Sequence, residues 1–131
     1  MPLYGGSCHC GAVRFTVDAD ITDVYVCDCS LCRKKNARMT SVRETKFAIT
    51  AGADKLGLYR WNTGVARHYF CTVCGIYTFH KKRSMPDHYG VNVYCLDDFD
   101  PAEQPIRAAD GKGMSLVDPA ARPDWPGPRQ S

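Results

Sequence analysis

Eight cysteines in a chain of 131 residues constrain this protein more than any other feature of its sequence. Seven of them fall into three close groups, and the eighth, Cys95, stands alone. The groups are Cys8-His9-Cys10, Cys27-Asp28-Cys29-Ser30-Leu31-Cys32 and Cys71-Thr72-Val73-Cys74. The opening residues 1–6 show neither the basic nor the apolar segment of a secretory signal, so we expect a reducing, cytoplasmic location. In that setting such cysteines indicate metal or redox chemistry more than a disulfide framework.

The composition is that of one soluble globular domain. Hydrophobic residues make up 44% of the chain and charged residues 24%, which is ordinary for a folded protein. Apolar stretches extend for only a few residues, so we expect no membrane-spanning segment and no membrane partner. The net charge of +3 is small and evenly spread. We therefore expect no nucleic-acid partner.

The chain consists mostly of short, β-rich runs separated by turns. Residues 12–17 alternate apolar and polar side chains, which places Val13, Phe15 and Val17 on one face of a strand. Similar runs occupy residues 23–26, 38–43, 46–50, 56–61, 66–70, 76–80 and 89–95. This spacing predicts a mainly β fold. The one helix that we expect is short, at about residues 30–36, with Ser30 capping its start.

The character of the chain changes after Asp97. Six of the eight prolines lie beyond this residue, and large apolar residues are few. We predict that residues 1–98 form one zinc-binding domain. Residues 99–131 would form a proline-rich C-terminal extension, an irregular chain packed on the domain or fraying from it.

Two of the cysteine groups end in a glycine, in Cys10-Gly11 and Cys74-Gly75. Two cysteines close together on a turn are spaced for a metal's tetrahedral edge, and a glycine next to them permits a positive φ. The two turns therefore look like halves of one structural zinc site. We expect its ligands to be Cys8, Cys10, Cys71 and Cys74.

The middle group offers three sulfurs within six residues, at Cys27, Cys29 and Cys32. Three protein ligands leave one position of a tetrahedral zinc open, as metal catalysis requires, and an open position suits a soft thiolate. The group is followed by Arg33-Lys34-Lys35. These basic residues favour thiolates and would hold the anionic ends of a ligand.

Other interpretations of the cysteines remain open at this stage. They include disulfides, an iron–sulfur cluster, a redox pair at Cys71-x-x-Cys74, and a second closed zinc site completed by Cys95 or a histidine. A lone cysteine such as Cys95, in a strand-like run, is more often a small buried hydrophobe. Histidines of this kind are more often surface or hydrogen-bonded side chains than ligands. Basic residues commonly form a solvated face, here Arg60, Arg67, His68, Lys81, Lys82 and Arg83.

The sequence resembles the glutathione-dependent formaldehyde-activating enzyme family. The similar segments are Gly6-Ser7-Cys8-His9-Cys10-Gly11-Ala12-Val13-Arg14-Phe15, the residues from Cys27 to Lys34, Arg67 to Gly75, and Val91 to Asp97. They cover roughly residues 5–98. The stretch from Cys74 to Phe79, with Arg83 to Pro86, is similar to the branch that includes centromere protein V. Where the family usually has a glycine after the basic pair, this chain has Asn36, which also tolerates the left-handed conformation.

The resemblance implies an Mss4-like fold of small antiparallel β-sheets around a structural zinc. It assigns that ion to Cys8, Cys10, Cys71 and Cys74, and a second zinc to Cys27, Cys29 and Cys32, in agreement with the glycine pattern.

We therefore predict a zinc-dependent carbon–sulfur lyase-type enzyme that handles an adduct of glutathione, or a similar thiol, with a small aldehyde. Cys27, Cys29 and Cys32 would form its catalytic site, and Arg33 and Lys34 would bind the thiol's carboxylates. The alternative is a non-catalytic zinc-binding module for protein interaction. The sequence does not specify the oligomeric state.

Overall fold

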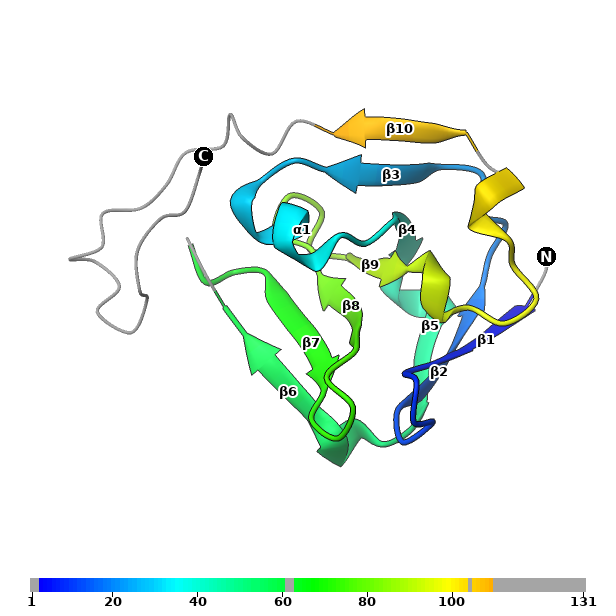
Figure 1. Cartoon of the computed structure of the whole chain (residues 1–131), viewed down its shortest axis with the longest axis vertical. Helices are drawn as coiled ribbons and strands as arrows, with labels where there is room; N and C mark the ends of the chain where they lie inside the picture. Colours follow the sequence, from blue (N-terminus) through cyan, green and yellow to red (C-terminus); the bar gives the residue numbers. More distant parts are fainter. Residues whose placement is uncertain (1–2, 61–62, 104, 110–131) are drawn as a thin grey trace.

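The computed structural model describes residues 3–60, 63–103 and 105–109, which form two β-sheets (Figure 1). One sheet has three strands in the order β1-β2-β5, and the other has seven in the order β10-β3-β4-β9-β8-β7-β6. The strands are β1 (Leu3–Ser7), β2 (Arg14–Asp18), β3 (Val24–Cys27), β4 (Met39–Arg43), β5 (Phe47–Ala51), β6 (Leu56–Tyr59), β7 (Arg67–Cys71), β8 (Tyr77–Lys81), β9 (His88–Asn92) and β10 (Ile106–Ala109). The predicted mainly β fold of small antiparallel sheets is confirmed.

Two strands were not predicted. β1 carries two glycines, Gly5 and Gly6, and few strand-forming residues, yet it pairs antiparallel with β2 along its whole length. β10 lies in the segment that we expected to be irregular, and it pairs in parallel with β3 at the edge of the larger sheet. That expectation was wrong for residues 106–109. The boundary at residue 98 stays a prediction, and residues 110–131 lie outside the described residues.

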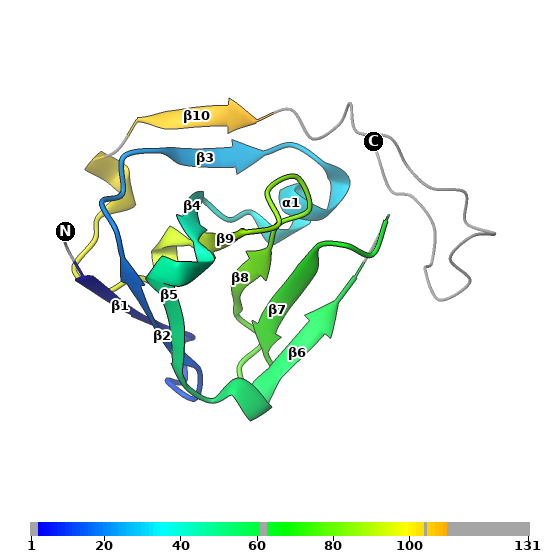
Figure 2. The same ribbon diagram turned by 180° about the vertical axis from the view of Figure 1, so that it is seen from behind.

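Aromatic packing holds the two sheets together. Phe15 of β2 and Phe79 of β8 are both buried, and their rings meet edge to face with centroids 5.5 Å apart. Phe47 of β5 lies 4.7 Å from Phe79 and stacks on Tyr89 at 4.3 Å. Seen from behind, β1, β2 and β5 lie on one side of the molecule and β6, β7 and β8 on the other (Figure 2). The aromatic cluster therefore fixes how the sheets are placed.

The predicted short helix is α1 (Ser30–Lys35), but its start differs from the prediction. Cys29, not Ser30, is the N-cap: its sulfur accepts a hydrogen bond from the Cys32 backbone N–H at 3.3 Å. The helix ends at Asn36, whose φ of 52° and ψ of 42° give the left-handed conformation expected there. Among the described residues, no helix is long and apolar enough to cross a membrane.

Residues 89–95 do not form one continuous strand. β9 ends at Asn92, and residues Val93–Cys95 form the short 3-10 helix η3. The Asn92 side-chain oxygen accepts a hydrogen bond from the Tyr94 backbone N–H at 3.2 Å. Asparagine commonly caps turns in this way, and the turn directs Cys95 into the core. The described residues contain three further 3-10 helices in connecting segments: η1 (Glu44–Lys46), η2 (Ala53–Lys55) and η4 (Pro101–Glu103).

Candidate functional site

The first and last cysteine pairs meet in space. The sulfurs of Cys8, Cys10, Cys71 and Cys74 all lie within 4.8 Å of one another, and we call these residues the four-cysteine group. Two of the sulfur–sulfur distances are 3.6 Å, between Cys8 and Cys10, and 3.8 Å, between Cys10 and Cys71. A tetrahedral zinc with bonds of about 2.3 Å separates its ligands by about 3.8 Å. The group therefore has the donors and the spacing of a closed zinc site.

Two tight turns aim these sulfurs. One connects β1 to β2 and the other connects β7 to β8, and each contains a glycine with positive φ, 79° at Gly11 and 80° at Gly75. The Val13 backbone N–H donates to the Cys8 sulfur at 3.4 Å, and the Val73 N–H donates to the Cys71 sulfur at 3.3 Å. Such contacts stabilise thiolates and orient metal ligands. The predicted role of the glycines in these turns is confirmed.

The four-cysteine group is continuous with the hydrophobic core. Cys8 and Cys71 are buried, and both belong to the core cluster that contains Phe15 and Phe79. Cys10 and Cys71 are 61 residues apart in the sequence. A metal held by this group would link two distant hairpins at the lower end of the molecule in Figure 1. This location suits a structural role.

Cys95 belongs neither to the four-cysteine group nor to the set of Cys27, Cys29 and Cys32. Its side chain is buried and donates a weak hydrogen bond to the Tyr77 carbonyl, with sulfur and oxygen 3.6 Å apart. Burial raises the pKa of its thiol to about 12, so this side chain stays protonated and uncharged at neutral pH. None of the eight cysteines forms a disulfide.

Replacing Cys95 by alanine is expected to leave the zinc content unchanged. Removing one buried sulfur atom should cost about 1 kcal/mol of stability, as small cavities do. Metal analysis and a thermal melt of the variant measure both quantities. A loss of one zinc per chain would instead identify Cys95 as a ligand.

The remaining three cysteines form a separate group near α1. The sulfurs of Cys27, Cys29 and Cys32 lie within 4.8 Å of one another, and we call these residues the three-cysteine group. Cys27 ends β3, Cys29 caps α1, and Cys32 lies in its first turn. Among the described residues, neither Cys95 nor a histidine joins them. Three soft donors without a fourth side chain fit a zinc site with an open position.

The three sulfurs strongly influence one another. The pKa of the Cys29 thiol is lowered to about 3 because the side chains of Cys27 and Cys32 donate to its sulfur. Contacts with the sulfurs of Cys27 and Cys29, together with burial, raise the pKa of Cys32 well above its usual value. Three thiolates this close repel one another unless a cation lies among them. The group therefore fits a divalent metal such as zinc by charge as well as by donor type.

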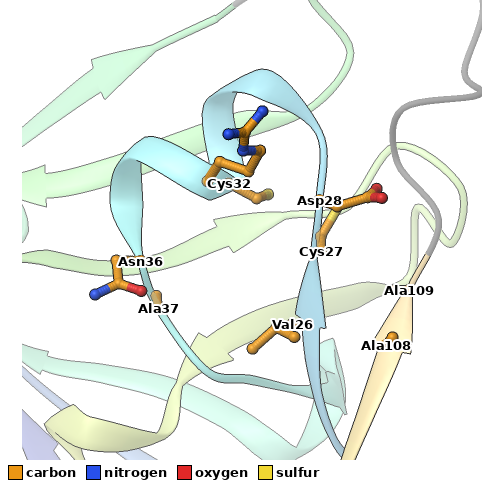
Figure 3. Close-up of a pocket in the computed structure, with 9 residues that line it drawn as sticks. Val26, Cys27, Asp28, Cys32, Asn36, Ala37, Ala108 and Ala109 are labelled. Atoms are coloured by element: carbon orange, nitrogen blue, oxygen red, sulfur yellow. The ribbon is translucent and has the colours of Figure 1, made fainter. Parts of the chain in front are cut away.

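A cavity of about 370 Å³ opens beside the three-cysteine group (Figure 3). Cys27 and Cys32 line it directly, and Ala108 and Ala109 of β10 line the opposite wall from Asn36 and Ala37. The Asp28 backbone N–H donates to the Ala109 carbonyl at 3.3 Å, which fixes β10 next to the end of β3. The proline-rich segment thus supplies part of the site, which the sequence analysis missed.

The two predicted substrate-binding residues lie differently. Arg33 lines the cavity, whereas Lys34 is exposed on α1 and is not among the lining residues. Contact of either residue with a substrate stays a prediction.

The predicted basic face is not a single solvated surface. His68 is buried, and Lys82 is partly buried with its Nζ 2.7 Å from the Ser41 hydroxyl. His68 belongs instead to a polar cluster under α1 that the sequence analysis did not identify. We call Lys35, His68, Tyr77 and His80 the buried polar cluster: His68 is buried, and the other three side chains are half-buried.

Comparisons with known proteins agree with this geometry. The sequence profile of the glutathione-dependent formaldehyde-activating enzyme family matches residues 3–109. A crystal structure of a Rhodobacter sphaeroides protein is similar, with 41% sequence identity and a TM-score of 0.72. The alignment covers 79% of this chain and 99% of that chain. Membership of the centromere protein V-like branch stays a prediction. The matched profile includes both cysteine groups and β10, and the chain belongs to the glutathione-dependent formaldehyde-activating enzyme family.

Proposed function

We propose that the chain is a zinc-dependent enzyme of the carbon–sulfur lyase type that binds glutathione or a similar thiol at the three-cysteine group. Its substrate would be the adduct of that thiol with a small aldehyde. The observation that carries the proposal is a set of three sulfurs with no fourth protein ligand among the described residues. Two of these cysteines, Cys27 and Cys32, line a cavity of about 370 Å³. The free cysteines support a reducing, cytoplasmic setting.

The residues of the site suit this chemistry. Zinc held by the three-cysteine group would lower the pKa of the incoming thiol and keep it as a thiolate. Arg33 lines the same cavity and presents a guanidinium group, which pairs well with a carboxylate of glutathione. Adduct formation bonds the thiolate sulfur to the aldehyde carbon, and the carbonyl oxygen takes up a proton. Cleavage of the adduct breaks that carbon–sulfur bond, returns the hydroxyl proton to solvent, and releases the aldehyde and the thiolate.

The small side chains of the cavity wall give a direct test. Ala108 pairs in register with Val26, and both line the cavity. Replacing Ala108 by leucine fills space that the thiol needs, so glutathione affinity should fall at least tenfold while zinc content and melting temperature hold. Isothermal titration of the zinc-loaded protein with glutathione measures this.

The matched control is Ala102→Leu, the same substitution at an exposed position away from the cavity. It should bind glutathione as the wild type does. Failure of the wild type to bind any thiol would overturn the proposed function and favour a non-catalytic zinc module. Unchanged affinity in Ala108→Leu would move the thiol site away from this cavity.

A further inference from the structure

The buried polar cluster holds one lysine against two histidines and a tyrosine. The Nζ of Lys35 lies 2.5 Å from Nδ1 of His68 and 3.8 Å from the centre of the Tyr77 ring. The His68 and His80 rings stack with centroids 4.9 Å apart, and the Tyr77 hydroxyl is hydrogen-bonded to His80. These contacts hold the Lys35 side chain, at the end of α1, against the strands β7 and β8.

Lys35 is the cationic member of this cluster. Burial lowers the pKa of His68 to about 2 and that of His80 to about 3, so both imidazoles are neutral at physiological pH. Neutral His68 can therefore accept a hydrogen bond from the Lys35 ammonium through Nδ1. The Tyr77 ring face adds a cation–π contact. Burial also lowers the pKa of Lys35, to about 8, which leaves it mostly protonated at neutral pH.

Lys35 follows Cys32 by three residues on α1, so the two side chains lie on neighbouring turns of one helix face. The sulfurs of Cys32, Cys29 and Cys27 each favour the charged form of Lys35. Three thiolates and one divalent ion together carry one net negative charge, and a fourth thiolate from a substrate raises this to two. Negative charge in a partly buried site is costly unless a cation lies nearby. Lys35 is placed to supply that cation.

We propose that Lys35 is a positioning residue of the three-cysteine site: its ammonium group, held by His68 and Tyr77, balances the negative charge of the zinc-bound thiolates and so favours binding of a thiol in its ionised form. The lysine does not line the cavity, so it acts through the field that it exerts on the cysteine sulfurs. This inference rests on the proposed function, because it supposes that a thiol occupies the open position.

The structure also shows how the cluster is accommodated. A Cβ atom at Gly90 of β9 would lie 2.3 Å from Cε1 of His80, so a glycine is needed where this ring packs. The Nε2 of His68 is buried without a hydrogen-bond partner among the described residues. A buried polar atom left unpaired is destabilising. Retaining such a group against Lys35 is consistent with a role in function more than in stability.

The test compares two variants of Lys35 that differ in charge. Lys35→Met keeps most of the side-chain length but removes the positive charge, and Lys35→Arg keeps the charge. Losing a nearby opposite charge raises the pKa of an acid by about one unit or more. The pH midpoint of glutathione binding to zinc-loaded Lys35→Met should therefore move up by about one unit. Competition with a chromophoric chelator should show about tenfold weaker zinc binding at the three-cysteine group.

Lys35→Arg should restore both the pH midpoint and the zinc affinity. The matched control is Lys81→Met, which removes a lysine that also lies over a tyrosine ring, 4.5 Å from the centre of Tyr89, and pairs with Glu44. It should behave as the wild type in both measurements. An unchanged midpoint and unchanged zinc affinity in Lys35→Met would overturn the inference.

Lys35→Gln is the second neutral variant, in case Lys35→Met does not fold. If both neutral variants unfold with zinc bound while Lys35→Arg folds, the charge stabilises the fold rather than the site, and the inference fails. If the wild type binds no thiol, the proposed function fails. The zinc-competition measurement still tests the action of Lys35 on the cysteine sulfurs in that case.

Discussion

Replacing Cys74 by serine is expected to lower the melting temperature of the zinc-loaded protein by about 15 °C. Cys74 belongs to the four-cysteine group, which joins two hairpins whose cysteines are at least 61 residues apart in the chain. A cross-link that closes a loop of this length removes about 4 kcal/mol of chain entropy from the unfolded state. For a domain of this size each kcal/mol shifts the melting temperature by about 4 °C.

The electrostatics of the group add to this effect. Backbone N–H groups of Cys10 and Ile76 lower the pKa of the Cys74 thiol to about 6, so the sulfur is held as a thiolate. A serine hydroxyl at the same position stays protonated and binds zinc poorly. Because a structural metal contributes its binding free energy directly to folding, one weakened ligand affects the whole domain.

Circular dichroism melts and metal analysis of Cys74→Ser measure the loss. Cys95→Ala is the matched control, because it alters a buried cysteine outside both groups. A melting temperature for Cys74→Ser within a few degrees of that of Cys95→Ala would contradict a structural role for the four-cysteine group.

The two cysteine groups could be predicted from the sequence because their chemistry is local. In the four-cysteine group, each of the two cysteine pairs lies on a tight turn, and the glycines at positions 11 and 75 mark those turns directly in the chain. The pairing of one turn with the other was the only long-range step. The left-handed conformation at Asn36 was predictable for the same reason, since it depends on the residue type and not on distant packing.

The errors concern features that depend on tertiary context. β10 has no strong strand pattern, and it forms because β3 offers a free edge and because Arg107 makes two hydrogen bonds to Asp23, at 3.0 and 2.9 Å. Ser30 is a better N-cap by type than Cys29. The geometry of the three sulfurs, however, places Cys29 at that position, where it accepts a hydrogen bond from Cys32.

The buried polar cluster was missed for a similar reason. Lysine side chains are normally exposed to solvent, and histidine side chains are only sometimes buried, so the sequence gives no reason to expect these residues in the interior. Here His80 packs against the backbone of Gly90, and His68 stacks on His80. His80 and Gly90 lie ten residues apart, and no local sequence pattern shows that they will be in contact. The pairing register of β8 and β9 places them opposite each other.

Replacing Cys32 by serine is expected to have the opposite pattern of effects from Cys74→Ser. Glutathione binding and turnover should fall more than about 100-fold, since even groups that merely support a metal ligand cost 10–100-fold when removed. The melting temperature should fall by no more than about 8 °C, because a link across six residues constrains the unfolded chain by only about 2 kcal/mol.

The structure supports this separation of stability from chemistry. Cys32 lies outside the hydrophobic core cluster, and the backbone N–H that it donates to the Cys29 sulfur is retained in a serine variant. The sulfur of Cys32 lines the cavity, so its loss acts where the thiol would bind. Thermal melts and glutathione titrations compare the losses of stability and of thiol affinity among three variants: Cys32→Ser, Cys74→Ser and the Cys95→Ala control. If Cys32→Ser melts as low as Cys74→Ser while the wild type takes up no thiol, both groups are structural, and the chain is a zinc module rather than an enzyme.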